Sequence, residues 1–120
     1  SGSLTTFLAS IVKPRGHVYT FDVEPKFMEI AEKNIKKAGM SKYVTMHNQN
    51  LKKSKKIPVD ECDLAIIDLG DPWEVLPQVR KMLKSSGSVV RGAESRLTLC
   101  FLTMACTSLR GIVLPRSARL

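Results

Sequence analysis

Cysteine and histidine, which form disulfide bonds and bind metal ions, are scarce in this chain. Its 120 residues include only three cysteines and two histidines. The cysteines are too few and too irregularly spaced for a disulfide framework, and neither histidine has a partner at metal-ligand spacing. We therefore expect no metal site, a reduced Cys62 in the core, and structural or exposed roles for His17 and His47.

Long hydrophobic runs and internal repeats are lacking as well. The longest apolar run covers residues 97–106, about half of the length that spans a bilayer. A secretory signal pattern is also missing. We expect no membrane partner and a cytoplasmic location.

Acidic residues are few relative to basic ones. Nineteen lysines and arginines against 11 acids give a net charge of +8. Such an excess favours a polyanionic partner and carries no information about the fold. Seven lysines are candidates for phosphate contacts, with a merely solvated surface as the open alternative: Lys33, Lys36, Lys37, Lys52, Lys53, Lys55 and Lys56.

Helix and strand patterns alternate along most of the chain. Apolar spacing predicts helices over 4–12, 26–38 and 73–84, and strands over 17–23, 43–47, 64–67 and 88–90. This order predicts an α/β protein with a doubly wound sheet. Since a strand normally precedes the first helix of such a fold, we expect the chain to begin within a glycine-rich loop. We divide the chain into a partial domain, 1–91, and an unassigned basic C-terminal segment, 92–120.

The second and third helices carry further local signals. Pro25 suits the first position of the second helix and Gly39 its end. The pairs Glu29–Lys33 and Glu32–Lys36 stand four residues apart on its polar side. The opposite side is an apolar stripe of Phe27, Ile30, Ala31, Ile35 and Ala38. We expect residues 85–87 to end the third helix.

Polar residues follow the predicted strands, where open α/β sheets bind their ligands. Gly2 opens the first helix, and Asp22 follows about 20 residues later, which is the spacing of a ribose-binding carboxylate after a glycine-rich loop. Asn50 and Asp68 follow later strands. Together they indicate a nucleoside-containing cofactor, without distinguishing NAD from S-adenosylmethionine.

Three residues after the predicted strand 64–67 also have a purely structural interpretation. Asp68 and Asp71 could simply solvate the turn and cap the next helix. Trp73 could stack on a base, but at the start of an amphipathic helix we expect it to be packed.

Three motifs resemble those of the tRNA (adenine-N1)-methyltransferase family: residues 1–5, 21–25 and 68–73. The Asp-x-x-x-Pro-Trp element is the most specific, and the resemblance covers roughly residues 1–90. It implies a Rossmann-like class I S-adenosylmethionine-dependent methyltransferase, incomplete at its N-terminus and atypical at its C-terminus. It also implies methylation of adenine 58 in tRNA (and 57 in archaea) by a homotetramer or heterotetramer.

The resemblance assigns roles to individual residues. Asp68 matches the catalytic carboxylate, and Asn50 stands where the family usually has aspartate. The implied cofactor contacts are Ser1, Gly2, Ser3, Asp22, Asn50, Leu51 and Asp68.

Other classes of protein stay open at this point. The first is a non-catalytic partner subunit of a tRNA methyltransferase complex, which the retained Asp22 and Asp68 disfavour. The second is another Rossmann-type enzyme, either an NAD enzyme or a methyltransferase for a protein or small molecule. The Pro72-Trp73 pair and the positive charge argue against it.

Overall fold

Residues 2–55, 59, 62–68, 72–91 and 101–106 are described by the structure, a computed structural model. The elements are α1 (Ser3–Val12), β1 (His17–Asp22), α2 (Pro25–Lys37), η1 (Ser41–Tyr43), β2 (Val44–Asn48), β3 (Cys62–Asp68), η2 (Pro72–Glu74), α3 (Leu76–Met82), β4 (Leu83–Arg91) and β5 (Phe101–Cys106). Among the described residues, none of the helices is long and apolar enough to cross a membrane.

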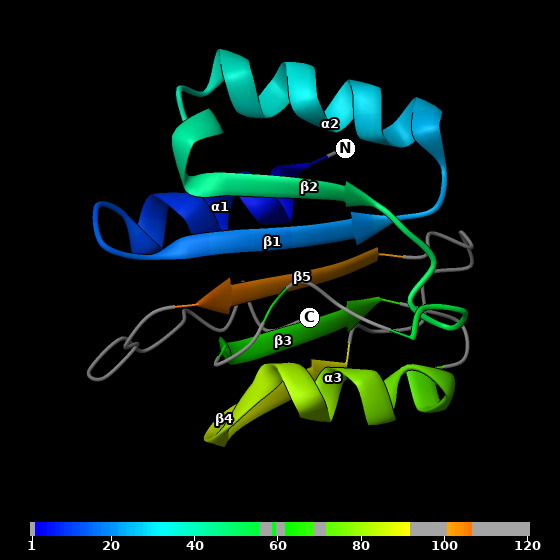
Figure 1. Ribbon diagram of the computed structural model, residues 1–120. Coiled ribbons are helices and arrows are strands. Elements are labelled where there is room, and N and C mark those ends of the chain that lie inside the picture. The colour runs from blue at the N-terminus through cyan, green and yellow to red at the C-terminus, as the bar shows by residue number, and fades with distance from the viewer. Residues whose placement is uncertain (1, 56–58, 60–61, 69–71, 92–100, 107–120) are drawn as a thin grey trace.

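The strands of the described residues lie in one five-stranded sheet of order β2-β1-β5-β3-β4 (Figure 1). Strands β1 and β2 are parallel, as are β3 and β4. Between these pairs lies β5, which is antiparallel to both β1 and β3. The sheet is therefore mixed. Its two parallel pairs agree with the predicted α/β class, and the antiparallel β5 lies in the segment that the sequence left unassigned. The apolar run that supplies β5 suits a central strand, because such a strand is covered on both faces.

Helices cover both faces of the sheet. On one face, Leu8 and Val12 of α1 pack against Val18 of β1 and Ile66 of β3. On the other face, Val79 and Met82 of α3 belong to the same core cluster as Phe21, Ala65 and Ile67. This division follows from strand geometry, since successive side chains point to opposite faces.

The predicted helix 73–84 is wrong in its extent. The chain instead forms the short helix η2, then α3, and β4 begins at Leu83. Pro77 lies in the first turn of α3, where its missing N–H leaves no hydrogen bond unmade. Ser85 and Gly87, expected to end the helix, lie within β4. Trp73 is 67% exposed, so the prediction that it is packed is also wrong.

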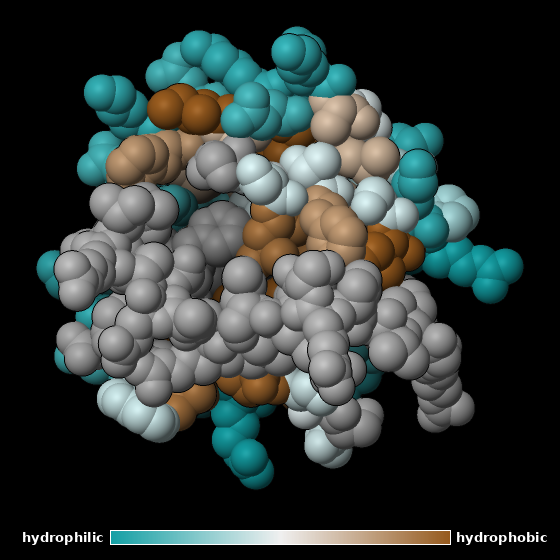
Figure 2. Space-filling view, turned by 180° about the vertical axis from the view of Figure 1, so that it is seen from behind, coloured by the Kyte–Doolittle hydropathy of each residue, from teal (hydrophilic) through white to brown (hydrophobic). Residues whose placement is uncertain are grey.

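Two further expectations about apolar residues need correction. Cys62 is fully buried as expected, but its sulfur is in a disulfide bond rather than reduced. The predicted apolar stripe of α2 is only partly covered, because Ala31 and Ile35 are buried while Phe27 and Ile30 are 40% and 43% exposed. From behind, hydrophobic surface accordingly lies among hydrophilic surface at the top of the molecule, where α2 runs (Figure 2).

Candidate functional site

The parallel strands β1, β2 and β3 end at the same edge of the sheet, here called the carboxyl edge (Figure 1). Asp22 is in register with Asn48 on one side and with Phe101 on the other. Phe101 is in turn in register with Asp68. Because neighbouring strands are about 4.8 Å apart, the Cα atoms of Asp22 and Asp68 are separated by roughly 10 Å.

Asp22 is held in a fixed position at this edge. It is 7% exposed, and its Oδ1 accepts a hydrogen bond from the Glu24 backbone N–H at 2.9 Å. Its backbone carbonyl accepts from Asn48 Nδ2 at 3.0 Å and from the Gln49 backbone N–H at 3.1 Å. The other carboxylate oxygen makes no hydrogen bond within the described part of the chain, so it can accept one from a ligand.

Gly2 lies at the start of α1 in a left-handed conformation, with φ of 76°. A Cβ atom on Gly2 would lie 3.1 Å from both Cα and Cβ of Ala31 in α2. The Gly2 carbonyl accepts hydrogen bonds from the backbone N–H and the hydroxyl of Thr6, at 2.9 and 2.8 Å. Both the backbone conformation and the close approach of α2 therefore require glycine here.

Substituting Gly2 tests that requirement. We expect Gly2→Ala to lower the free energy of unfolding by about 2 kcal/mol, because strain at positive φ adds to the contact with Ala31. Gly39 is the matched control, since it has φ of 72° but a Cβ atom there would meet no other atom within 4 Å. Gly39→Ala should cost about 1 kcal/mol. Equal losses in urea unfolding would show that the contact with α2 is unimportant.

The structure describes three further predicted cofactor residues, and they differ from one another in burial and hydrogen bonding: Asn50, Leu51 and Ser3. Asn50 is half-buried, and its Oδ1 accepts from the Lys52 backbone N–H at 3.0 Å. Its amide nitrogen is left available to a ligand. Leu51 is 5% exposed and belongs to the core cluster of Phe21 and Val59, so its side chain offers little surface to a ligand. Ser3 is the exposed first residue of α1.

Part of the predicted site falls outside the described residues or side chains. The structure places Asp68 at the end of β3 by its backbone, level with Asp22 across β5. Ser1 and the turn 69–71 are outside the described residues, and with them the interpretation of Asp71 as a helix cap. Sequence reasoning passed over Asn48, although its place at the end of a predicted strand was an available signal.

Several of the candidate lysines lie close to this edge, in the segment that follows β2. Lys53 and Lys55 are exposed and make no ion pair within the described residues. Lys52 Nζ pairs with Glu74 Oε2 at 2.6 Å. On α2, the predicted pair of Lys33 and Glu29 is present at 3.1 Å.

Both histidines have structural surroundings on the sheet. His17 Nε2 lies 2.7 Å from Thr45 Oγ1, and the His47 ring stacks on Phe21 with centroids 4.9 Å apart. Burial lowers the pKa of each below the ordinary value for histidine. Within the part of the chain that the structure describes, no three His, Cys, Asp or Glu side chains are grouped as metal ligands.

Comparison with known proteins gives consistent matches. The chain is 30% identical over 80 residues to the tRNA (adenine(58)-N(1))-methyltransferase catalytic subunit of Dictyostelium discoideum, covering 63% of this chain and 26% of that protein. It is 28% identical over 114 residues to the tRNA (adenine(57)-N(1)/adenine(58)-N(1))-methyltransferase of Methanocaldococcus jannaschii, covering 75% and 40%. The corresponding Thermus thermophilus tRNA (adenine(58)-N(1))-methyltransferase is 33% identical over 86 residues, covering 70% and 32%.

The chain thus spans between 26% and 40% of the length of these curated relatives. A family profile matches residues 1–93, which is more than half of the chain. That profile describes the tRNA methyltransferase complex GCD14 subunit. The match includes all three motifs on which the sequence resemblance rests, and it ends just after β4. The chain belongs to the family of the tRNA methyltransferase complex GCD14 subunit.

Proposed function

We propose that this chain forms part of an enzyme that transfers a methyl group from S-adenosylmethionine to N1 of adenine in tRNA. The observation that carries the proposal is the family match over residues 1–93. It is supported by the placement of Asp22 and Asp68 on one row of the sheet. Adenine 58 is the position named for the relatives, and we propose it here as well.

The finer fold assignment is also part of the proposal. We assign residues 1–91 to a partial Rossmann-like domain of the class I S-adenosylmethionine-dependent methyltransferases. Two parallel strand pairs with helices on both faces support that assignment. Segment 92–120 supplies β5 to the sheet, and the remainder of the segment stays unassigned.

The described residues at the carboxyl edge fit this cofactor. The second carboxylate oxygen of Asp22 can accept from a ribose hydroxyl, and the Asn50 amide nitrogen can donate to the adenine edge. Gly2, Ser3 and Ser1 would supply the loop backbone, and Leu51 would contribute through its backbone, because its side chain is buried in the core. When bound, S-adenosylmethionine supplies a methyl group carried on a positively charged sulfur.

In this proposal the chain's own residues position the target base and stabilise its charge. Adenine N1 has a lone pair at neutral pH, so the reaction needs no strong base. The target adenine is stacked within folded tRNA, and it must therefore leave its stack to reach the bound methyl group. Asp68 would accept from the exocyclic amine, orient the ring and stabilise the positive charge that develops on it. Trp73, with 67% of its surface exposed, is available to stack on a neighbouring base.

Lysine neutralisation tests the contact with tRNA. We expect Lys53→Gln with Lys55→Gln to reduce the slope of log affinity against log salt by about 1.5, because each lost phosphate contact removes about 0.7–0.9 from the slope. Lys13→Gln with Arg15→Gln is the control, since it removes the same charge from the turn before β1, at the opposite edge of the sheet. Filter binding across a salt series measures both slopes. An equal change in the two variants would reduce Lys53 and Lys55 to a solvated surface.

The reaction itself is tested by product analysis. The chain is incubated with S-adenosylmethionine and unmodified tRNA, and nucleoside mass spectrometry should detect 1-methyladenosine. The matching control is tRNA with guanosine in place of the target adenine, which should give no product. Binding of tRNA and cofactor without any product would favour a non-catalytic partner subunit. Methylation of a protein or small molecule instead of tRNA would favour another Rossmann-type methyltransferase.

The assembly and location of the enzyme complete the proposal. We propose a homotetramer or heterotetramer in the cytoplasm, with tRNA as its macromolecular partner. The net charge of +8 supports the polyanionic partner.

A further inference from the structure

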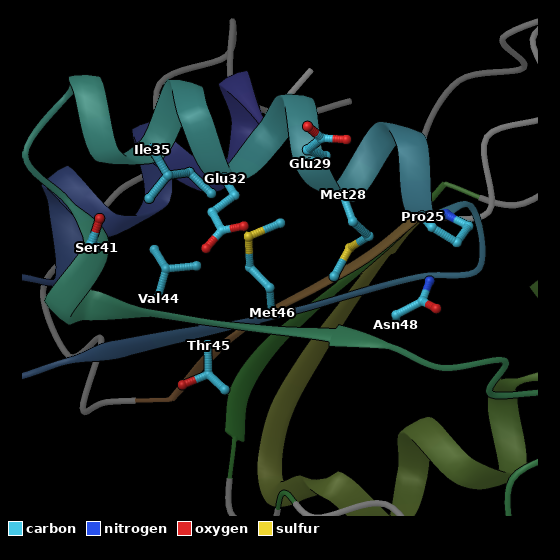
Figure 3. A pocket seen from close by; sticks show the side chains of 10 residues that line it. All are labelled: Pro25, Met28, Glu29, Glu32, Ile35, Ser41, Val44, Thr45, Met46 and Asn48. Carbon is cyan, nitrogen blue, oxygen red and sulfur yellow. The ribbon is translucent and has the colours of Figure 1, made fainter.

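A groove of about 570 Å³ lies between α2 and the outer edge of β2 (Figure 3). Side chains from the two elements face each other across it: Met28, Glu32 and Ile35 from α2, and Val44, Met46 and Asn48 from β2. Its volume is within the usual range for ligand sites. Of these residues, Asn48 alone lies at the carboxyl edge, where it is in register with Asp22.

The strand that forms one wall has an open side. Among the described strands, β2 is the last in the sheet and pairs only with β1. Edge strands are usually protected from further pairing by proline, charged side chains, bulges or a covering helix or loop. Here α2 lies beside β2, with the groove between them. The sequence of β2, Val-Thr-Met-His-Asn, has no proline and no lysine, arginine or acid. Its five residues pair with β1 without a break in register. Within the described residues, the backbone N–H and C=O groups on the outer side of β2 therefore have no strand partner.

The groove is acidic, in a chain with a net charge of +8. Glu29 and Glu32 line it, and none of the described residues that line it is a lysine or arginine. Glu29 is already paired with Lys33 at 3.1 Å. The predicted pair of Glu32 with Lys36 is not formed, and Glu32 instead extends toward β2 (Figure 3). Met28 and Met46 add thioether surface that adapts to different side chains.

We propose that this groove binds an extended segment of a partner protein, which adds to β2 as a further strand and places a lysine or arginine beside Glu32. Backbone pairing with β2 would supply affinity, and side-chain pockets would supply specificity. Because side chains alternate along a strand, every second residue of the segment would face the groove, level with Val44, Met46 and Asn48. The expected pattern is an apolar residue, any residue, then a basic residue. Because glutamates line the groove, it would repel the phosphates of RNA. The proposed partner therefore differs from tRNA, and this inference does not depend on the proposed function.

A designed peptide provides the probe. The acetylated and amidated heptapeptide Ser-Val-Thr-Lys-Thr-Val-Ser places valine, lysine and valine on one face in either orientation. Titrated into the full chain, it should bind saturably and shift the backbone NMR signals of β2. The signals of β4, the edge strand on the other side of the sheet, should stay unchanged. A version with glutamate in place of lysine, and one with N-methylated backbone amides along the pairing edge, should each bind at least tenfold more weakly.

Charge variants of the protein complete the test. Glu32→Gln should weaken binding of the lysine peptide about fivefold, as for loss of a single partly exposed ion pair. Glu74→Gln removes the same charge from η2, outside the groove, and should leave binding unchanged. Equal effects of the two variants, or shifts away from β2, would overturn the proposal. So would self-association through β2 that excludes the peptide, because the occupant would then be a second copy of the chain.

Discussion

Replacing Asp68 by asparagine is expected to slow methyl transfer to tRNA by about a hundredfold or more, while binding of S-adenosylhomocysteine and tRNA changes little. The substitution keeps the size of the side chain and one acceptor oxygen but removes its negative charge. In the proposed reaction, adenine becomes positively charged as N1 is methylated. A group that acts mainly on developing charge affects turnover far more than ground-state binding, and losing one such partner typically costs about a hundredfold or more.

Asp63 provides the matched control for this experiment. It lies near the other end of the same strand, where its Oδ1 pairs with Lys84 Nζ at 3.2 Å. Asp63→Asn makes the same chemical change far from the carboxyl edge, and the rate of 1-methyladenosine formation should match that of the unaltered chain. If Asp68→Asn methylates tRNA at the unaltered rate, Asp68 only caps the helix that follows, and the catalytic assignment fails.

Local signals in the sequence were sufficient for the first half of the fold. Pro25 begins α2, and Gly39 follows its end at positive φ, both as predicted. The strand predictions for β1, β2 and β3 agree with the structure to within two residues at each end. These elements were predictable because caps and apolar periodicity act over a few neighbouring residues.

The later elements depend on contacts between segments far apart in the sequence. Residues 101–106 belong to the longest apolar run, which argued only against a membrane span. Whether such a run is a strand, and where it is inserted, depends on an opening between β1 and β3 that no local pattern reveals. Trp73 was misjudged for a related reason. Apolar character predicts burial only when another element covers the position, and in the structure most of its surface is exposed.

The candidate site likewise has a part that could be predicted from the sequence and a part that could not. The common edge of Asp22 and Asp68 was predictable, because both residues end strands and parallel strands have their carboxyl ends at the same side of the sheet. The groove beside β2 could not be predicted, since it depends on which strand is outermost and on Glu32 leaving its expected pair with Lys36. The spacing of Glu32 and Lys36 predicted that ion pair from helix geometry alone. It could not take into account the groove beside β2, toward which Glu32 extends.

The strongest test of the cofactor assignment is Asp22→Asn, which we expect to weaken binding of S-adenosylhomocysteine by on the order of fiftyfold, a typical loss for charge-assisted hydrogen bonds. Asparagine retains the oxygen that accepts from the Glu24 N–H, so the turn after β1 should survive and the free energy of unfolding should stay nearly constant. What is lost is the charge and the second acceptor, which we assign to the ribose hydroxyls.

Glu24→Gln is the control for that titration. Glu24 lies two residues further on, is exposed, and accepts from the Lys26 backbone N–H through Oε1 at 3.4 Å, a role that glutamine can keep. Calorimetry should therefore give unchanged binding for Glu24→Gln. NAD, titrated in parallel, should bind more weakly than S-adenosylhomocysteine. Unaltered affinity in Asp22→Asn would remove Asp22 from the cofactor site, and tighter binding of NAD would replace the methyltransferase assignment with a dinucleotide one. The control separates these outcomes from a general effect of charge at the end of β1, because both variants raise the net charge equally.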